Sequence, residues 1–154
     1  DRARDDDACP GALQTHRAAD GQLARIRLPG GMITPAQLDA LALAATDFGS
    51  SALELTSRGN VQIRGLRDTG VVAERLSDAG LLPSITHERV RNIVASPLSG
   101  RSGGLSDVRE LVLALDSAVQ RDPRLSLLPG RFLFGLDDGR GDISGIGADA
   151  GIHA

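Results

Sequence analysis

The segment LELTSRGNVQIRG (residues 53–65) constrains the fold of this chain more than any other. Apolar and polar residues alternate on both sides of an Arg-Gly-Asn turn, and a period of two is typical of strands with one buried face. The pattern therefore predicts a β-hairpin. The residues expected to face the core are Leu53, Leu55, Val61 and Ile63, and those expected on the outer face are Glu54, Thr56, Arg58, Gln62 and Arg64.

Strand and helix signals flank this hairpin in a regular order. LARIRL (residues 23–28) alternates like a strand, and TPAQ (residues 34–37) begins a helix with a threonine cap, a first-turn proline and the glutamine of a capping box. A second helix is expected over residues 68–80, and RVRNIVA (residues 89–95) is expected to form a fourth strand. The order βαββαβ is the split βαβ, or ferredoxin-like, arrangement, in which two helices cover one face of a four-stranded antiparallel sheet.

The rest of the chain is expected to form a long helix and two more strands, too few elements to close a domain. The fold class predicted is α+β. The expected division is a polar N-terminal arm (residues 1–21), a ferredoxin-like half-domain (residues 22–98) and the beginning of an incomplete second domain (residues 99–154), with a helix over 106–120 and strands over 131–136 and 143–153. Such an open end suggests a fragment or a partner that completes it.

Composition excludes several classes of function. The 154 residues carry a net charge of −3, which gives no general attraction to nucleic acid or to an anionic membrane. No apolar run approaches the roughly 20 residues that span a bilayer, so we expect a cytoplasmic, soluble protein. The single cysteine, Cys9, excludes an internal disulfide and a cysteine-only metal cage, and it is expected to be a partly buried small residue. The three histidines show no metal-binding spacing, and no residue is assigned a metal-binding or catalytic role.

The open face of the predicted sheet is strongly basic. If the helices cover the Val61 and Ile63 side, six arginines project from the other side: Arg25, Arg27, Arg58, Arg64, Arg89 and Arg91. Adjacent strands lie only about 4.8 Å apart, and like charges placed opposite one another destabilise a sheet. Glu54 and Glu88 can neutralise part of this cluster. The positive charge that remains on this face is expected to be neutralised by an anion or by an acidic partner surface.

Several occupants of this face are compatible with its charge. It could be an ordinary solvated strand face. RNA recognition on such a sheet needs aromatic residues for base stacking, and these strands have none. A small phosphate would need a glycine-rich loop before a helix, for which PGGMIT (residues 29–34) is a weak candidate. A flat, polycarboxylated molecule fits best, because arginine binds carboxylates through two parallel hydrogen bonds.

Several motifs resemble the nitrite and sulfite reductase family. TSRGNVQIRG is similar to that family's siroheme-contacting hairpin, and RVRNIVASPLSG is similar to its Arg-Asn-Val/Ile segment with the following Pro-Leu-x-Gly loop. LLPGRFLFGLDDGRGD resembles its Leu-Pro-Arg-Lys-Phe-Lys strand. The N-terminal ACPGALQTHRAADGQLARIRLPGG most resembles one branch, the precorrin-3B synthases of cobalamin biosynthesis.

This resemblance implies a half-domain that holds a tetrapyrrole, a precorrin or siroheme, by its carboxylates. The residues that match the family's motif positions, or lie beside them on the basic face, are Arg58, Gln62, Arg64, Arg91, Asn92, Arg131 and Arg27. One departure is informative, because Leu133 occupies the position of a lysine that the reductases use in protonating their substrate. Its presence argues against sulfite or nitrite reduction and fits the precorrin branch.

The resemblance also implies what the whole protein does. Family members carry a [4Fe–4S] cluster on four cysteines, expected C-terminal to residue 154, so this chain alone is expected to be inactive. The full-length relative is expected to be a monooxygenase-type oxidoreductase that hydroxylates precorrin-3A and forms a lactone. The alternatives are a siroheme-dependent nitrite or sulfite reductase, or a noncatalytic module whose arginine face docks an acidic protein or a second copy as a homo-oligomer.

Overall fold

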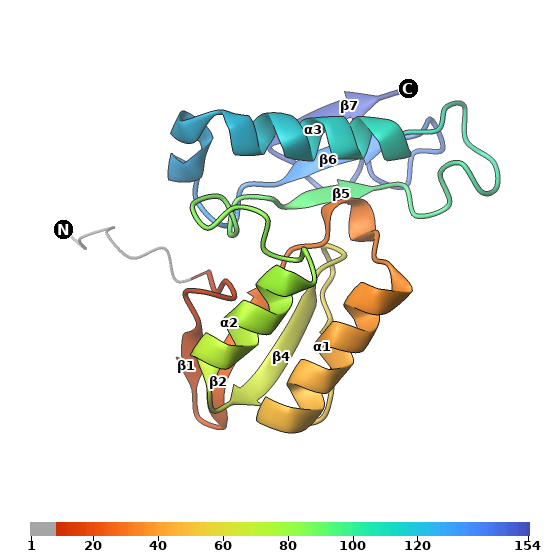
Figure 1. Ribbon diagram of the computed structural model, residues 1–154. Helices are drawn as coiled ribbons and strands as arrows, with labels where there is room; N and C mark the ends of the chain where they lie inside the picture. The colour runs from red at the N-terminus through yellow and green to blue at the C-terminus, as the bar shows by residue number, and fades with distance from the viewer. Residues whose placement is uncertain (1–8) are drawn as a thin grey trace.

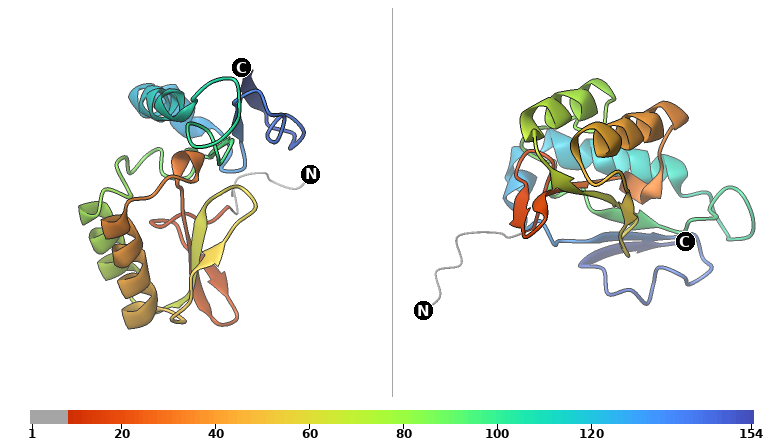
Figure 2. Two further views of the ribbon diagram at one scale, coloured as in Figure 1. Left: turned by 90° about the vertical axis from the view of Figure 1, so that its right-hand side faces the viewer. Right: turned by 90° about the horizontal axis from the view of Figure 1, so that it is seen from below.

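The computed structural model describes residues 9–154, which form an α+β fold with two sheets (Figure 1). The first sheet contains β1 (His16–Ala18), β2 (Gly21–Ile26), β3 (Glu54–Leu55) and β4 (Val61–Leu66). All its pairings are antiparallel, in the order β1-β2-β4-β3. Helices α1 (Pro35–Phe48) and α2 (Thr69–Asp78) lie side by side on one face of this sheet and leave the other face uncovered by helices (Figures 1 and 2).

Local capping explains where both helices begin. The Thr34 side chain accepts a hydrogen bond from the Gln37 backbone N–H, and the Gln37 side-chain oxygen accepts one from the Thr34 backbone N–H, so the predicted capping box is confirmed. Asp68 caps α2 by accepting from the Val71 N–H. Both helices bury a narrow apolar stripe on the sheet, where Leu41, Val72 and Leu76 pack against Ile26 and Ile63.

The second sheet is parallel and consists of β5 (Ile93–Ala95), β6 (Phe134–Asp137) and β7 (Ala150–His153). Helix α3 (Arg109–Arg121) packs on it through Val112, and Ile93 and Leu136 lie in the same small core. Two short 3₁₀ turns, η1 (Pro29–Gly31) and η2 (Pro123–Leu127), complete the fold. The η1 turn lies between the two sheets and contacts both β5 and α3 (Figure 1).

The fold class is confirmed, but the predicted position of the fourth strand is wrong. β5 pairs in parallel with β6 and belongs to the second sheet, because Ile93 packs with Val112 and Leu136 and not with the core under α1 and α2. The first sheet takes its outer strand from residues 16–18, which the sequence analysis placed in the polar arm. The last strand is also shorter than expected, because residues 143–149 form turns before β7 begins.

Leu55 is a second correction. It was expected to face the core with Val61, its cross-strand neighbour, but its side chain is 85% exposed. β3 is one of the two edge strands of its sheet, and apolar contact from the helices ends at Val61, Ile63 and Leu53. Among residues 9–154, no helix is both long and apolar enough to cross a lipid bilayer.

Candidate functional site

A basic pocket of about 270 Å³ opens where the tip of the β3–β4 hairpin meets the segments that precede β5 and β6. We call it the arginine pocket. Its lining residues are Cys9, Arg25, Thr56, Ser57, Arg58, Asn60, Asn92, Gly130 and Arg131. None of these described lining residues is acidic, so the positive charge of the pocket is not neutralised from within its own wall.

The hairpin tip is held together by internal hydrogen bonds, which position Arg58 in this pocket. The Thr56 hydroxyl accepts from the backbone N–H groups of Arg58 (3.4 Å) and Asn60 (3.1 Å), and the Gly59 N–H donates to the Thr56 carbonyl. Gly59 has a φ of 71°, a conformation that L-residues with side chains rarely adopt. Arg58 then extends to the segment before β6 and donates to the Arg131 carbonyl at 2.8 Å. The structure therefore brings Arg58 into contact with the backbone of Arg131, and both are predicted site residues.

Two buried asparagines form the floor of the pocket. The Asn60 side chain accepts from the Leu28 N–H at 3.0 Å and donates to the Asn92 carbonyl oxygen at 3.2 Å. The Asn92 amide in turn donates to the carbonyls of Arg89 (3.1 Å) and Gly130 (2.6 Å). Asn92, predicted as a ligand contact, therefore donates its amide protons to backbone carbonyls of the protein. Its role in the structure is to hold the segments that carry the arginines.

Arg27 is the most unusual group at this site, because it is a buried cation with unused hydrogen-bonding capacity. Its side chain is 3% exposed and donates to the carbonyls of Arg89 (3.3 Å) and Gly130 (3.4 Å). The remaining guanidinium nitrogen, Nη1, is buried without a hydrogen-bond partner among residues 9–154. Burial, followed by repulsion from Arg25, lowers the pKa of Arg27 to about 10. A buried donor without an acceptor is costly, and an anion would remove that cost.

The open face of the first sheet carries a row of polar groups that begins at the pocket. Arg25, Gln62 and Glu54 are cross-strand neighbours on β2, β4 and β3. The Arg25 guanidinium donates to the Gln62 carbonyl oxygen, with Nε at 2.8 Å, and the Gln62 amide donates to Glu54 at 3.1 Å. Glu54 also pairs with Arg64 at 3.0 Å. Gln62 therefore orients Arg25, whereas Arg64 is neutralised by Glu54 and lies outside the pocket.

Arg91 lies elsewhere, and its predicted position on the common arginine face is wrong. Its guanidinium makes a two-bond pair with Asp116 of α3, at 2.6 and 2.8 Å, and the pair is almost completely buried. Arg91 and Asp116 line a different pocket, next to Thr34 and Leu113. The physical reason is the changed position of β5, because the segment that precedes it packs against α3 and not on the open face of the first sheet.

Glu88 also differs from expectation. It was expected to neutralise part of the arginine face, but its buried carboxylate accepts from the backbone N–H groups of Ala12 (2.8 Å), Leu13 (3.1 Å) and Gln14 (3.4 Å). A Cβ added to Gly11 would lie 2.2 Å from a Glu88 oxygen, so a larger residue there would displace this carboxylate. The effect is to hold the N-terminal segment against the protein, with half-exposed Cys9 in the arginine pocket. Sequence reasoning missed this position of Cys9.

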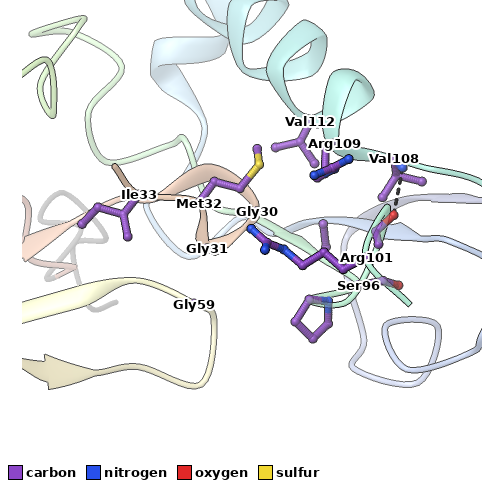
Figure 3. A pocket seen from close by; sticks show the side chains of 13 residues that line it. Gly30, Gly31, Met32, Ile33, Gly59, Ser96, Arg101, Val108, Arg109 and Val112 are labelled. Atoms are coloured by element: carbon purple, nitrogen blue, oxygen red, sulfur yellow. Dashed lines mark hydrogen bonds between the residues drawn. The ribbon is translucent and has the colours of Figure 1, made fainter. Parts of the chain in front are cut away.

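A larger pocket, of about 500 Å³, lies on the other side of the hairpin tip (Figure 3). Gly30, Gly31 and Gly59 form one wall, and Arg101 extends from the opposite side toward Met32. Arg109 is paired with Asp107 at 2.6 Å, and this hydrogen bond lowers the pKa of Asp107 to about 2. The PGGMIT segment forms a wall of this pocket, and its last residue, Thr34, caps the following helix.

An acidic cluster lies at the end of β6, in the turn over residues 137–144. Asp137 accepts from the backbone N–H groups of Gly139, Gly141, Ile143 and Ser144, at 2.9 Å each, and from the Ser144 hydroxyl. These bonds, above all that from Gly141, hold its pKa far below the usual range. Asp138 pairs with Arg140, and Asp142 accepts from the Ser96 hydroxyl. These three carboxylates lie close enough to share a cation, but all of them already bind donors of the protein.

Comparison with known proteins identifies relatives for nearly the whole chain. Residues 14–74 match the family model described as the nitrite/sulfite reductase ferredoxin-like half domain. The ferredoxin–nitrite reductase of Synechococcus elongatus is 36% identical over 86% of this chain and 26% of that protein. The precorrin-3B synthase of Sinorhizobium is 31% identical over 96% of this chain and 32% of that protein.

A solved structure shows the same fold. The NirA protein of Mycobacterium tuberculosis superposes with a TM-score of 0.69 and 23% identity, over 86% of this chain and 25% of that one. In all three comparisons the chain spans about a quarter to a third of the length of the relative.

Proposed function

Residues 14–74 belong to the nitrite/sulfite reductase ferredoxin-like half-domain family, and from this premise we propose that the chain is the tetrapyrrole-binding part of an oxidoreductase of the precorrin-3B synthase type. The observation that carries the proposal is the arginine pocket. It brings Arg25, Arg58 and Arg131 together with no acidic residue among its described lining residues, and Arg27 has a buried donor that finds no acceptor in the part of the chain that the structure describes.

The chemistry of this donor set suits a carboxylate. Hydrogen bonds between a guanidinium and a carboxylate are charge-assisted, and each contributes about 1.5–3 kcal/mol when it is protected from water. A volume of about 270 Å³ is at the lower end of the range for small-molecule sites. The pocket can therefore take a carboxylate-bearing arm of a tetrapyrrole, while the ring lies outside it. We propose that Arg58, Arg131 and Arg27 bind this carboxylate, and that Gln62 and Asn92 hold the arginines in place.

In this proposal the roles are divided between the chain and its ligand. The tetrapyrrole, as a precorrin substrate or as siroheme, supplies the reacting ring when it is bound. The residues of this chain fix the orientation of the ring through one of its carboxylates and exclude water from the guanidinium groups behind it. Arg91 and Arg64, also predicted as ligands, are paired with Asp116 and Glu54, and we assign them to supporting positions.

The whole enzyme needs groups that this chain does not carry. We propose that oxygen-dependent hydroxylation and lactone formation on precorrin-3A belong to the full-length protein, and that its [4Fe–4S] cluster is held by residues outside this sequence, because one cysteine cannot supply four thiolates. The cytoplasmic setting and the homo-oligomer expected from the sequence stay predictions.

A siroheme-dependent nitrite or sulfite reductase is the second candidate, because the relative from Synechococcus is 36% identical. Leu133 favours the precorrin type. It stands where the reductases are expected to carry a lysine, and its side chain is 3% exposed, so it offers a ligand neither charge nor access.

Absorbance titration with carboxylated porphyrins tests the proposal. Uroporphyrin carries twice as many carboxylates as coproporphyrin, so we expect a Soret shift with tighter binding of uroporphyrin. Arg58→Ala and Arg131→Ala should each weaken binding about tenfold or more, as expected for the loss of a charge-assisted bond. Arg67→Ala, at the opposite end of β4, is the matched control. A folded protein that binds neither porphyrin, or whose binding is as sensitive to Arg67→Ala as to Arg58→Ala, would contradict the proposal.

A further inference from the structure

The pocket of about 500 Å³ beside the hairpin tip has no role in the proposed function (Figure 3). Its wall comes from four parts of the chain, which are residues 30–33, Gly59, the segment 95–101 and the first turn of α3. We call it the glycine pocket. Its volume lies within the range of roughly 300–1,000 Å³ that is usual for small-molecule sites. The cavity can therefore hold a whole small molecule, and not only one arm of a large one.

One part of this wall consists of main chain without side chains. Gly30, Gly31 and Gly59 have φ values of 65°, 66° and 71°, a conformation that residues with side chains rarely adopt. The turn and the hairpin tip lie against each other, because a Cβ added to Gly59 would be 3.5 Å from the Gly31 Cα. The Gly31 N–H donates to the Leu28 carbonyl at 2.8 Å, which closes the turn. A flat ring can therefore approach the main chain closely at this wall.

The adjoining part of the wall is apolar. Val108 and Val112, at the beginning of α3, are almost completely buried, and Ala95 of β5 lies with them in the same small core. A Cβ added to Gly30 would lie 3.0 Å from Val112, so the glycine wall and this apolar wall are continuous. Met32 packs against the same core and also lines the pocket. These walls suit a flat apolar body, because its apolar surface is taken out of water on binding.

Arg101 gives the glycine pocket a cation that is available to a ligand. Its side chain extends from the side opposite the glycines toward Met32 (Figure 3), and its guanidinium makes no hydrogen bond or ion pair with residues 9–154. Arg109, the other arginine of the wall, is paired with Asp107 at 2.6 Å. No acidic residue lines the pocket within the described part of the chain. The charge of Arg101 is therefore left for an anion.

The loop that carries Arg101 is attached to the beginning of α3. The Ser99 hydroxyl donates to the Ser106 carbonyl at 3.2 Å and accepts from the Val108 N–H at 2.9 Å. The Arg101 N–H donates to the Leu98 carbonyl at 2.9 Å, which closes a turn directly before the arginine. The main chain of Arg101 is thus held at the edge of the pocket, and its long side chain spans the distance to a ligand.

We propose that the glycine pocket binds a flat aromatic molecule that carries one anionic group. The ring system lies along the main chain of the three glycines and against the side chains of Met32 and Val112. Arg101 binds the anionic group through charge-assisted hydrogen bonds. This inference goes beyond the proposed function, because the glycine pocket and the arginine pocket share no lining residue.

The test compares two dyes with the same aromatic body on the full chain. Anilinonaphthalene sulfonate carries one negative charge and phenylnaphthylamine carries none, and the fluorescence of both rises in an apolar site. We expect one molecule of either dye to bind, the anionic dye about tenfold or more tightly, because Arg101 binds its sulfonate. Arg101→Gln should remove this preference by weakening the anionic dye alone. Arg121→Gln, at the exposed end of α3, is the matched control and should change neither affinity.

Two further measurements locate the dye. Met32→Gln keeps the length of the side chain but makes its end polar, so it should weaken both dyes to a similar degree. Uroporphyrin should displace neither dye, and a chain that binds no porphyrin should still bind both dyes, which separates this inference from the proposed function. Equal affinities of the wild type for the two dyes, equal effects of Arg101→Gln and Arg121→Gln, or displacement of a dye by uroporphyrin would overturn the proposal.

Discussion

The arginine pocket and the turn at residues 137–144 use charge in opposite ways. In the turn, Asp137 is saturated by donors of the protein and Asp138 is paired with Arg140. In the pocket, Arg25, Arg58 and Arg131 converge with no carboxylate among the described lining residues, and Nη1 of Arg27 is buried with no acceptor within residues 9–154. The difference indicates where the fold satisfies its own charges and where it leaves charge available for a ligand.

Two buried arginines show the same contrast within one part of the chain. Arg91 has both acceptors of Asp116 opposite its guanidinium, whereas Arg27 has only two long bonds to backbone carbonyls. Burying a cation is costly in both cases, but only Arg91 recovers that cost within the protein. On this reasoning Arg91 serves stability and Arg27 serves binding, although the sequence pattern treats them alike.

The largest expected effect follows from breaking the buried ion pair of Arg91 with Asp116. Asp116→Ala should lower the free energy of unfolding by about 3–5 kcal/mol, because it leaves the Arg91 guanidinium buried without a partner. Urea unfolding followed by circular dichroism measures this. Glu110→Ala, at an exposed position of the same helix, is the control and should change stability by less than about 0.5 kcal/mol. A similar small loss for both variants would mean that the pair is not structural.

The next effect concerns affinity and compares two arginines of the hairpin. Arg58→Ala should weaken uroporphyrin binding by about ten- to a hundredfold, whereas Arg64→Ala should change it less than about twofold, because Glu54 already occupies Arg64. Soret titrations at one fixed salt concentration give both values. Equal losses would show that the whole sheet face, and not the pocket, binds the ligand.

A smaller effect is expected for Arg27→Met, which should raise the free energy of unfolding, whereas most substitutions of buried residues lower it. Methionine fills a similar space without a charge, so the ligand-free protein should become more stable by about 1 kcal/mol or more. The same variant should bind uroporphyrin more weakly. Urea unfolding and porphyrin titration of one preparation check both statements. A variant that loses stability as well as affinity would assign Arg27 to the same structural role as Arg91.

The smallest effect concerns acid and the surface pair of Asp107 with Arg109. The hydrogen bond to Arg109 lowers the pKa of Asp107 to about 2 in the folded chain, from an ordinary value near 4. The pair therefore stabilises the fold above about pH 4, and this contribution disappears as the pH falls toward 2. The free energy of unfolding of Asp107→Asn should therefore be lower than that of the wild type above about pH 4. The two values should approach each other as the pH falls toward 2. Because both side chains are exposed, we expect the change to be just measurable in acid unfolding curves.

The parts of the fold that sequence predicts well are those set by local chemistry. Thr34 and Gln37 lie within one helical turn, and Asp68 caps the helix that follows it directly, so the beginning of each helix is contained in a few residues. The hairpin around Gly59 is local in the same sense. Its alternation correctly placed Val61 and Ile63 against the helices.

The errors come from contacts between distant segments. Nothing in the sequence of residues 89–95 specifies that their partner is β6 of a second, parallel sheet. Arg91 was therefore expected beside Arg58, although its partner is Asp116, 25 residues further along the chain. The same reason hides the pairing of Arg58 with the backbone of residue 131. The alternation of residues 23–28 revealed the polar face of Arg25 but not the burial of Arg27 under Gly130.

The most direct test of the account is NMR of the arginine Nε–H groups, assigned with Arg→Lys variants, while uroporphyrin is added. The account predicts that the signals of Arg25, Arg27 and Arg58 shift together with the Soret band, whereas the signals of Arg91 and Arg140 keep their positions because both guanidinium groups are already paired. A Soret change accompanied by movement of the Arg91 signal, with the signals of Arg27 and Arg58 unchanged, would contradict it.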